Sequence, residues 1–187
     1  YDSKYLVPLM LMEALLGGAD ESELTLDKKN QTRRMVVDQG EQEAASSFKT
    51  FNMSYKDTGL FGVYYKAPDN RCEDAMWYTL WNMVRLCHKT TDEEVAFART
   101  QLKSKLVTEF GSNAGVASSL AKSLMCYGRM TTIGEMFARI DAVDKDTIKQ
   151  TAKALINDQD HALAAVGPIH ELPDYTWIRR RSHWLRY

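Results

Sequence analysis

The chain has 187 residues, with 24 Lys and Arg against 25 Asp and Glu and a formal net charge of −1 at pH 7. This length corresponds to one domain and is sufficient to bury a hydrophobic core without disulfides or metals. The balanced charge argues against a nucleic-acid binder that acts through overall positive charge, and against a disordered chain extended by charge repulsion.

The first two segments differ sharply in composition. Residues 5–16 are dominated by Leu and Met and are followed by two glycines, which predicts a buried helix that ends at Gly17. This run is too short, and too interrupted by a proline and a glutamate, to cross a bilayer, so no transmembrane helix is expected. Residues 19–43 hold seven acidic and four basic residues, and predict a polar, solvated insertion with at most a short helix near 33–37.

Residues 46–66 are rich in aromatic side chains and predict two strands joined by a turn. The turn is assigned to Asp57, Thr58 and Gly59, and Gly59 is expected to adopt a backbone conformation that a Cβ disfavours. The triplet Asp-Thr-Gly also presents a carboxylate in aspartic proteases, which need two such carboxylates. Only one copy is present, so a structural turn is the favoured interpretation and a dimeric protease is the alternative.

Helices dominate the second half of the chain. Apolar residues recur three and four positions apart in five segments, at 73–87, 92–110, 114–127, 133–140 and after Asp144. Thr91 and Glu94 have the spacing of a capping box at the start of the second segment. The apolar run 162–169 predicts a strand buried on both faces. Strands followed by consecutive helices predict an α+β fold, an antiparallel sheet with helices packed on one face.

No catalytic or metal-binding residue is assigned from the motifs. The three cysteines show no C-x-x-C spacing, and the four histidines show no H-x-x-E-H or H-E-x-x-H spacing. Cys87 and His88 are adjacent, so on a helix their side chains point to different faces and do not predict a catalytic pair.

The segment 171–187 is a basic, aromatic tail. Such a tract suits contact with a partner protein or with anionic lipid headgroups, and the alternative is a solvated terminus with a few docked aromatics. The candidate contact residues are Trp177, Arg179, Arg180, Arg181, Trp184, Arg186 and Tyr187.

Five sequence blocks between residues 51 and 175 resemble a known family. They are FNMSYKDTGLFGVYY (51–65), LCHKTTDEEVAFARTQLKSKL (86–106), SLMCYGRM (123–130), FARIDAVDKDTI (137–148) and AAVGPIHELPDY (164–175). These blocks are similar to the C-terminal half of β-type subunits of the pitrilysin-like M16 metallopeptidase family. That group includes the β subunit of the mitochondrial processing peptidase and the core 1 subunit of the cytochrome bc1 complex. The resemblance covers roughly residues 46–187, and the segment before it matches only loosely.

The resemblance implies a single M16 C-terminal-type domain over 1–187 that lacks its first strands, so that the sheet is incomplete. An open edge is then expected beside Phe48, Phe51 and Tyr55, where another chain must pair. The resemblance places the family's zinc site in the N-terminal half, so no cofactor is expected in this chain. Zinc is expected only in a companion N-terminal half, and only if that half carries an intact H-x-x-E-H.

The function implied by the resemblance is that of a non-catalytic core subunit piece of the mitochondrial cytochrome bc1 complex (complex III). Its expected place is peripheral, on the matrix side of the inner membrane. The alternative is the C-terminal half of a processing peptidase β subunit that helps to enclose presequence substrates. The implied partners are the N-terminal half of the same subunit as a separate chain or fragment, an alpha or core 2 type M16 subunit and other bc1 subunits, with no nucleic acid.

Overall fold

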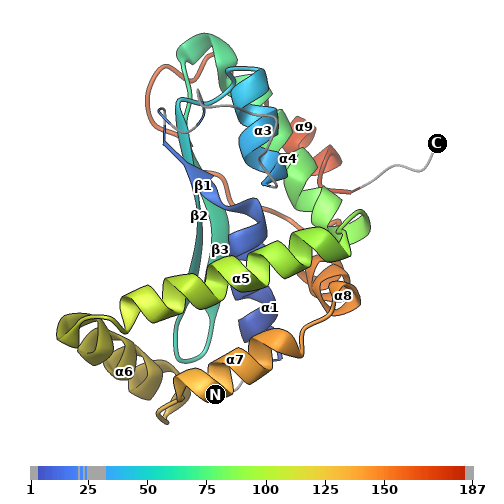
Figure 1. Ribbon diagram of the computed structural model, residues 1–187. Coiled ribbons are helices and arrows are strands. Elements are labelled where there is room, and N and C mark those ends of the chain that lie inside the picture. Colours follow the sequence, from blue (N-terminus) through green and yellow to red (C-terminus); the bar gives the residue numbers. More distant parts are fainter. Residues whose placement is uncertain (1–3, 21, 23, 25–32, 184–187) are drawn as a thin grey trace.

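The structure is a computed structural model that describes residues 4–20, 22, 24 and 33–183 (Figure 1). Its elements in chain order are α1 (Leu6–Leu16), β1 (Gly18–Ala19), α3 (Arg34–Glu41), β2 (Ser47–Ser54), β3 (Gly59–Lys66), a 3-10 turn (Asp69–Arg71), α4 (Cys72–His88), α5 (Asp92–Glu109), α6 (Asn113–Tyr127), α7 (Ile133–Asp141), α8 (Lys145–Leu155) and α9 (Tyr175–Arg180).

Helix α1 forms where the Leu- and Met-rich run predicts it. Leu11, Met12 and Leu16 are fully buried, and the helix ends at Gly17, whose φ of +71° favours glycine. The chain then enters β1 directly. The helix therefore connects the core to the first strand of the sheet, and the predicted glycine stop is confirmed.

The sheet has three antiparallel strands in the order β1-β2-β3. Strand β1 pairs only two residues, Gly18 and Ala19, with β2, whereas β2 and β3 pair along all eight of their residues. At Phe48 the expectation of an open edge is wrong, because β1 pairs there, whereas β1 does not extend along β2 to Phe51 or to Tyr55. Strand β3 forms an edge of the sheet along its whole length.

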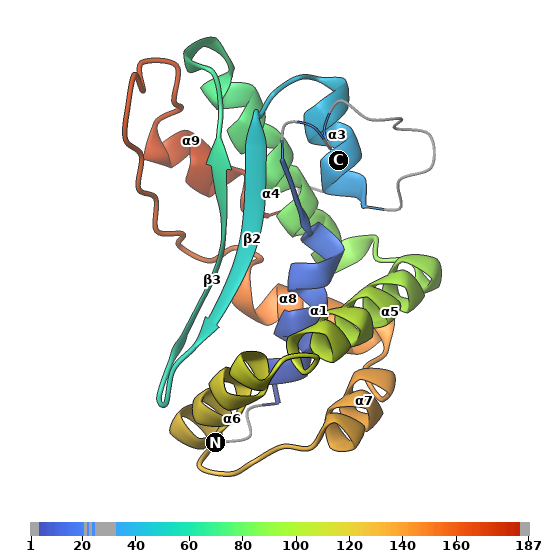
Figure 2. The same ribbon diagram turned by 60° about the vertical axis from the view of Figure 1, so that its left-hand side comes forward.

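The helices pack against one face of this sheet, as predicted (Figures 1 and 2). Phe48 on β2 belongs to the main core cluster, together with buried residues from α1, α4, α5 and α8. Phe61, Val63 and Tyr65 on β3 are partly buried and pack against this cluster. The other face of the hairpin carries no helix in Figure 2. The α+β fold with helices on one face is thereby confirmed.

Helix α3 corrects part of the predicted polar insertion. It extends to Glu41 rather than ending near 37, and one face of it is buried through Met35, Val36 and Gln39. Gln39 donates its side-chain amide to the Ala75 carbonyl and to the Thr79 hydroxyl of α4. The 19–43 segment has few apolar residues, so the sequence pattern does not reveal this buried face. Residues 21, 23 and 25–32 of that segment lie outside the described residues.

The predicted helices of the second half are present as α4 to α8. Asp144 occupies the N-cap position of α8, although its side chain makes no capping hydrogen bond. Helix α6 is peripheral, since none of its described side chains is fully buried. In the part of the chain that the structure covers, no helix is long and apolar enough to cross a membrane.

The prediction of a doubly buried strand at 162–169 is wrong in this structure. The segment is irregular and exposed between α8 and α9, and Val166 is fully accessible at 102%. A strand needs a neighbour for its N–H and C=O groups, and none of the described strands pairs with this segment.

Candidate assembly interface

The uncovered face of the hairpin is apolar toward its tip, and it carries Lys49 and Lys66 toward the other end. Side chains alternate between faces along a strand, and the register pairs Met53 with Leu60 and Phe51 with Gly62 on this face. Met53, Leu60 and Tyr64 are about half exposed or more, at 49%, 53% and 67%. The Phe51 ring lies over Gly62, where a Cβ would come within 2.7 Å of the ring. This face therefore presents large apolar groups to solvent or to a partner.

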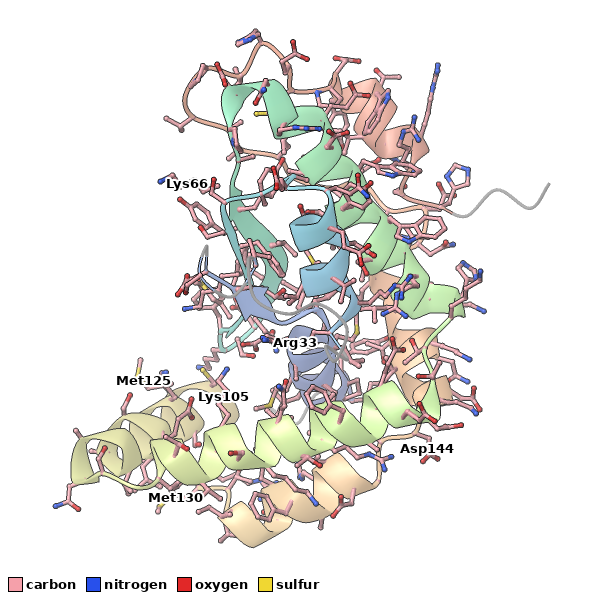
Figure 3. The ribbon with its side chains drawn as sticks, turned by 45° about the horizontal axis from the view of Figure 1, so that its top comes forward. Arg33, Lys66, Lys105, Met125, Met130 and Asp144 are labelled. Atoms are coloured by element: carbon pink, nitrogen blue, oxygen red, sulfur yellow. The ribbon has the colours of Figure 1, made fainter. Side chains whose placement is uncertain are left out.

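The same apolar character continues at the tip of the hairpin and the end of α6. Tyr55 is 54% exposed, and Met125 and Met130 are 75% and 56% exposed near α6 (Figure 3). The thiol of Cys126 donates to the main-chain carbonyl of Ser54 at 3.2 Å, which ties α6 to the tip. Methionine side chains are flexible and polarizable, so this end suits contact with a partner surface.

The turn at the tip is shifted from its predicted position. Tyr55 N–H donates to the Thr58 carbonyl at 2.9 Å, so the two loop residues are Lys56 and Asp57. Gly59 is the first residue of β3, and its φ lies outside the left-handed region. A Cβ at Gly59 would meet only the Met53 carbonyl at 3.2 Å. The expectation that Gly59 needs a glycine-only conformation is therefore wrong.

The capping residues Thr91 and Glu94 lie together at the start of α5. The Thr91 hydroxyl accepts from Glu94 N–H at 3.2 Å, and the Glu94 carboxylate accepts from Thr91 N–H at 3.1 Å. The other carboxylate oxygen of Glu94 accepts from Arg85 Nη1 at 2.9 Å. This cluster links the end of α4 to the start of α5, so its role is structural.

Two of the predicted tail contacts form an aromatic and cationic stack. The guanidinium of Arg181 lies 4.0 Å from the ring centroid of Trp177 and 4.6 Å from that of Trp77. Trp77 in turn stacks on Trp81, with centroids 6.1 Å apart. The stack joins α9 to α4, so Trp177 and Arg181 contact the domain itself.

Arg179 is held by internal ion pairs. It donates to the carboxylates of Asp158 and Asp160, at 2.8 Å and 2.5 Å, and to the Ser182 hydroxyl. The hydrogen bond from Arg179 lowers the pKa of Asp158, and the same bond raises the pKa of Arg179. Arg180 is exposed. The remaining candidates lie outside the described residues: Trp184, Arg186 and Tyr187.

Zinc, which the resemblance implies for the family, does not fit the residues that the structure describes. Among them, no three His, Cys, Asp or Glu side chains gather closely enough to hold a metal ion. His161 is half-buried, and burial lowers its pKa. Burial raises the pKa of Cys87 to about 11, which keeps this thiol protonated and unreactive at neutral pH.

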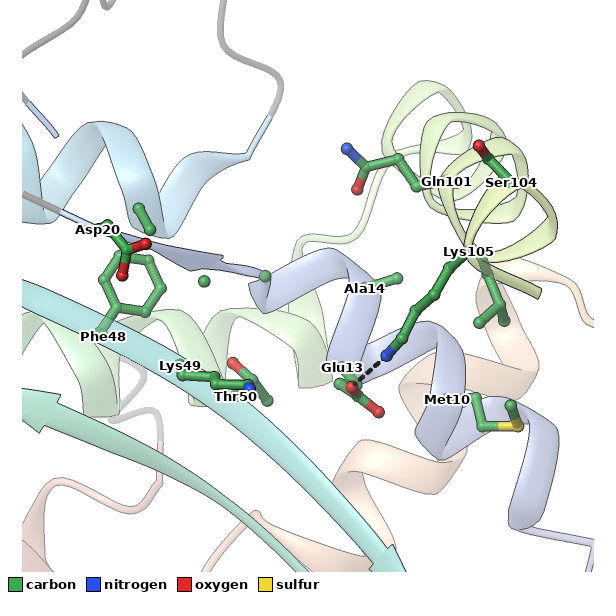
Figure 4. Close-up of a pocket in the computed structure, with 14 residues that line it drawn as sticks. Met10, Glu13, Ala14, Asp20, Phe48, Lys49, Thr50, Gln101, Ser104 and Lys105 are labelled. Carbon is green, nitrogen blue, oxygen red and sulfur yellow. Dashed lines mark hydrogen bonds and ion pairs between the residues drawn. The ribbon is translucent and has the colours of Figure 1, made fainter. Parts of the chain in front are cut away.

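A hollow of about 620 Å³ lies between α1, the β1–β2 strands and α5 (Figure 4). Glu13 and Lys105 form a 3.0 Å ion pair across it. The buried hydroxyl of Thr50 on its wall has no hydrogen-bond partner among the described residues. Its described lining contains neither a cysteine nor a histidine, so it offers no nucleophile paired with a base.

An α+β domain that has helices on one face of its sheet, a free strand edge and an exposed apolar surface is the kind of domain that packs against another polypeptide. The chain belongs to the peptidase M16 family, because residues 1–102 match the family described as the peptidase M16 inactive domain. The resemblance stated from the sequence is thereby confirmed.

Relatives carry two kinds of name. The chain is 39% identical over 184 residues to a probable mitochondrial-processing peptidase subunit beta of Arabidopsis thaliana, covering 97% of this chain and 34% of the relative. It is 38% identical to the human mitochondrial-processing peptidase subunit beta and 35% identical to human cytochrome b-c1 complex subunit 1, in each case over 75% of this chain and 29% of the relative. The chain thus spans about a third of the length of these mitochondrial proteins.

A solved structure shares the fold. A chain of complex III2 from Candida albicans, with Inz-5 bound, superposes with a TM-score of 0.90 at 24% sequence identity. The match covers 98% of this chain and 44% of that chain. The described arrangement of sheet and helices is therefore a fold that occurs within a larger polypeptide.

Proposed function

We propose that the chain is a non-catalytic core subunit piece of the mitochondrial cytochrome bc1 complex, placed peripherally on the matrix side of the inner membrane. The observation that carries the proposal is the match of residues 1–102 to the M16 domain described as inactive. The relatives named as cytochrome b-c1 complex subunit 1 support the assembly, and the fold shared with a complex III2 chain agrees with it.

The partners in this proposal are the N-terminal half of the same subunit, an alpha or core 2 type M16 subunit and other bc1 subunits. The exposed apolar face at Met53, Leu60 and Tyr64 supports this role, because such a face is costly to leave in water. The chain itself holds no cofactor in this reading, and any zinc belongs to a companion N-terminal half.

A second candidate function is the C-terminal half of a processing peptidase β subunit that helps to enclose presequences. The specific support is that the Arabidopsis relative, at 39% identity, carries the peptidase name. The two functions differ in the companion half, because only the peptidase needs an intact H-x-x-E-H there.

The test is to tag the chain in the cells that produce it, isolate its assembly and identify the subunits by mass spectrometry. Recovery with cytochrome b and cytochrome c1 supports the bc1 function. Recovery with only an alpha-type M16 subunit, together with chelator-sensitive cleavage of a presequence peptide, supports the peptidase. The purified chain alone is expected to contain no stoichiometric zinc by metal analysis.

A further inference from the structure

We propose that the hollow between α1, the β1–β2 strands and α5 binds a free α-amino acid with an apolar side chain. The hollow measures about 620 Å³, which is within the size range of small-molecule sites. Three separate parts of the fold form its walls, and charged, uncharged polar and apolar side chains all line it (Figure 4). The inference goes beyond the proposed function and does not depend on which assembly contains the chain.

A buried hydroxyl on the strand wall is the first observation that points to a ligand. Thr50 lies two residues after Phe48 on β2, and therefore on the same, helix-covered face of the strand. It lines the hollow with only 3% of its surface exposed, and its hydroxyl has no hydrogen-bond partner among the described residues. A buried hydroxyl without a partner has lost the hydrogen bonds that it made to water, and a polar ligand atom at this wall restores one.

A carboxylate and an ammonium group line the same hollow as a close pair. Glu13 on α1 and Lys105 on α5 form an ion pair of 3.0 Å, which is drawn as a dashed line in Figure 4. Their side chains remain 24% and 57% exposed, so each can make a further contact. A ligand with only a positive charge is repelled by Lys105, and a ligand with only a negative charge is repelled by Glu13. A ligand that carries both charges is attracted by both residues.

An α-amino acid presents both charges in one short head group. Its ammonium and carboxylate are attached to the same carbon atom, so the ammonium can lie beside Glu13 while the carboxylate lies beside Lys105, and the ion pair need not separate. Hydrogen bonds between charged groups of this kind are stronger than those between neutral groups. The other charged residues of the described lining, Asp20 and Lys49, are also of opposite sign, so positive and negative charges are equal in number.

Uncharged polar side chains extend this head-group site along α5. Gln101 lies four residues before Lys105, on the same face of the helix, and Ser104 directly precedes Lys105. Both residues line the hollow. An amide and a hydroxyl can each donate and accept hydrogen bonds, so they suit the carboxylate of an amino acid as well as its ammonium group.

The apolar part of the lining determines which side chain the amino acid carries. Met10 and Ala14 lie four residues apart on one face of α1, and Leu102 contributes from α5. Ala14 and Gly17 are small residues in a segment rich in Leu and Met, so space remains where longer side chains would fill it. An apolar side chain gains by leaving water for such a wall, whereas a polar one loses its hydration. L-Leucine is therefore the probe.

The experiment measures binding of carbon-14-labelled L-leucine by equilibrium dialysis at pH 7. The protein is the full 187-residue chain, tagged and isolated with the subunits that accompany it. Two competing analogues each lack one charge: L-leucinamide keeps only the ammonium group, and N-acetyl-L-leucine keeps only the carboxylate. L-Glutamine is a third competitor, because it keeps the head group and replaces the apolar side chain with a polar one.

Matched variants separate the hollow from the rest of the chain. Thr50→Val removes the hydroxyl and keeps the shape, and Thr100→Val does the same at an exposed threonine of α5 outside the hollow. Lys105→Gln removes the ammonium group, and Lys122→Gln does the same on α6. Ala14→Met fills the hollow with a residue that favours a helix. Urea unfolding of each variant checks the fold, and Thr50→Val should not lower the midpoint, because its hydroxyl has no described partner to lose.

We expect saturable binding of one L-leucine per chain, with all three competitors at least tenfold weaker. Thr50→Val and Lys105→Gln should each weaken L-leucine binding at least fivefold, the two control variants should weaken it less than twofold, and Ala14→Met should abolish it. The inference is overturned if L-leucine does not bind saturably, or if any of the three competitors binds as tightly as L-leucine. It is also overturned if folded Thr50→Val or Ala14→Met binds L-leucine as the unchanged chain does. None of these outcomes bears on the proposed function, which the recovered subunits decide.

Discussion

The capping cluster at the start of α5 permits a quantitative test. Thr91→Ala removes the hydroxyl that accepts from Glu94 N–H and should cost about 1 kcal/mol of unfolding free energy. Glu94→Ala removes the reciprocal bond to Thr91 N–H and also the 2.9 Å bond from Arg85, whose side chain is only 13% exposed. A hydrogen bond to a charged group contributes roughly 1.5–3 kcal/mol, so Glu94→Ala should cost about 2–3 kcal/mol.

The two substitutions should not add. Once Thr91 is alanine, the hydrogen bond from the residue-91 N–H to the Glu94 carboxylate is weaker, so the double variant should lose roughly 0.5–1 kcal/mol less than the sum of the two single variants. The assay is urea unfolding of the assembled protein, followed by the fluorescence of the four tryptophans. Glu94→Gln is an intermediate variant, because its single amide oxygen can accept only one of the two bonds and its NH2 group replaces the other acceptor. Strict additivity within about 0.3 kcal/mol would refute the reciprocal capping box.

Three further predictions follow from single contacts. Gly115→Ala would place a Cβ 1.9 Å from the carbonyl that ends α5 and should cost roughly 1–3 kcal/mol, whereas Gly134→Ala, in open space on α7, should gain about 0.5–1 kcal/mol in the same unfolding assay. Burial raises the pKa of Tyr65 from 10.0 to about 12 and that of Cys87 from 9.0 to about 11. Because both folded-state pKa values are raised, their stabilisation is complete below pH 9 and is lost between pH 9 and 12, and Tyr65→Phe should abolish the part above pH 10. Arg181→Ala should cost roughly 0.5–1 kcal/mol for each ring contact it loses and change the tryptophan emission, while Arg181→Lys should retain part of both; an unchanged spectrum would contradict the stack.

Local signals in the sequence predict most of the fold because they act over a few residues. The glycine after α1 and the three-residue spacing of Thr91 and Glu94 each specify an element boundary that the structure contains. Helix α3 was underestimated because its buried residues, Met35, Val36 and Gln39, sit among charged neighbours. A buried glutamine that bonds to α4 is a tertiary feature, and no local pattern reveals its partner.

The candidate interface was less predictable than the fold, because it depends on tertiary contacts that leave no local pattern in the sequence. The aromatic tail predicted contact residues by composition, but only the structure shows that Arg181 stacks between two tryptophans and that Arg179 is neutralised by two aspartates. For the hairpin, the aromatic residues of 46–66 predicted the two strands, but not which strand forms the edge of the sheet. Strand order depends on the two-residue pairing of β1 with β2, and a pairing that short leaves no pattern in the sequence.

At residues 162–169 the sequence predicts a buried strand, whereas the structure has an irregular, exposed segment. Local sequence preference and observed structure disagree most where a stabilising neighbour is missing, and Val166 is the most exposed large apolar side chain of the described chain. Strand β3 also lacks a neighbour. Its side chains Phe61, Val63 and Tyr65 pack against the core, while its main-chain groups that point away from β2 have no hydrogen-bond partner among the described residues. The described structure therefore leaves both the 162–168 segment and the outer edge of β3 without a hydrogen-bonding neighbour.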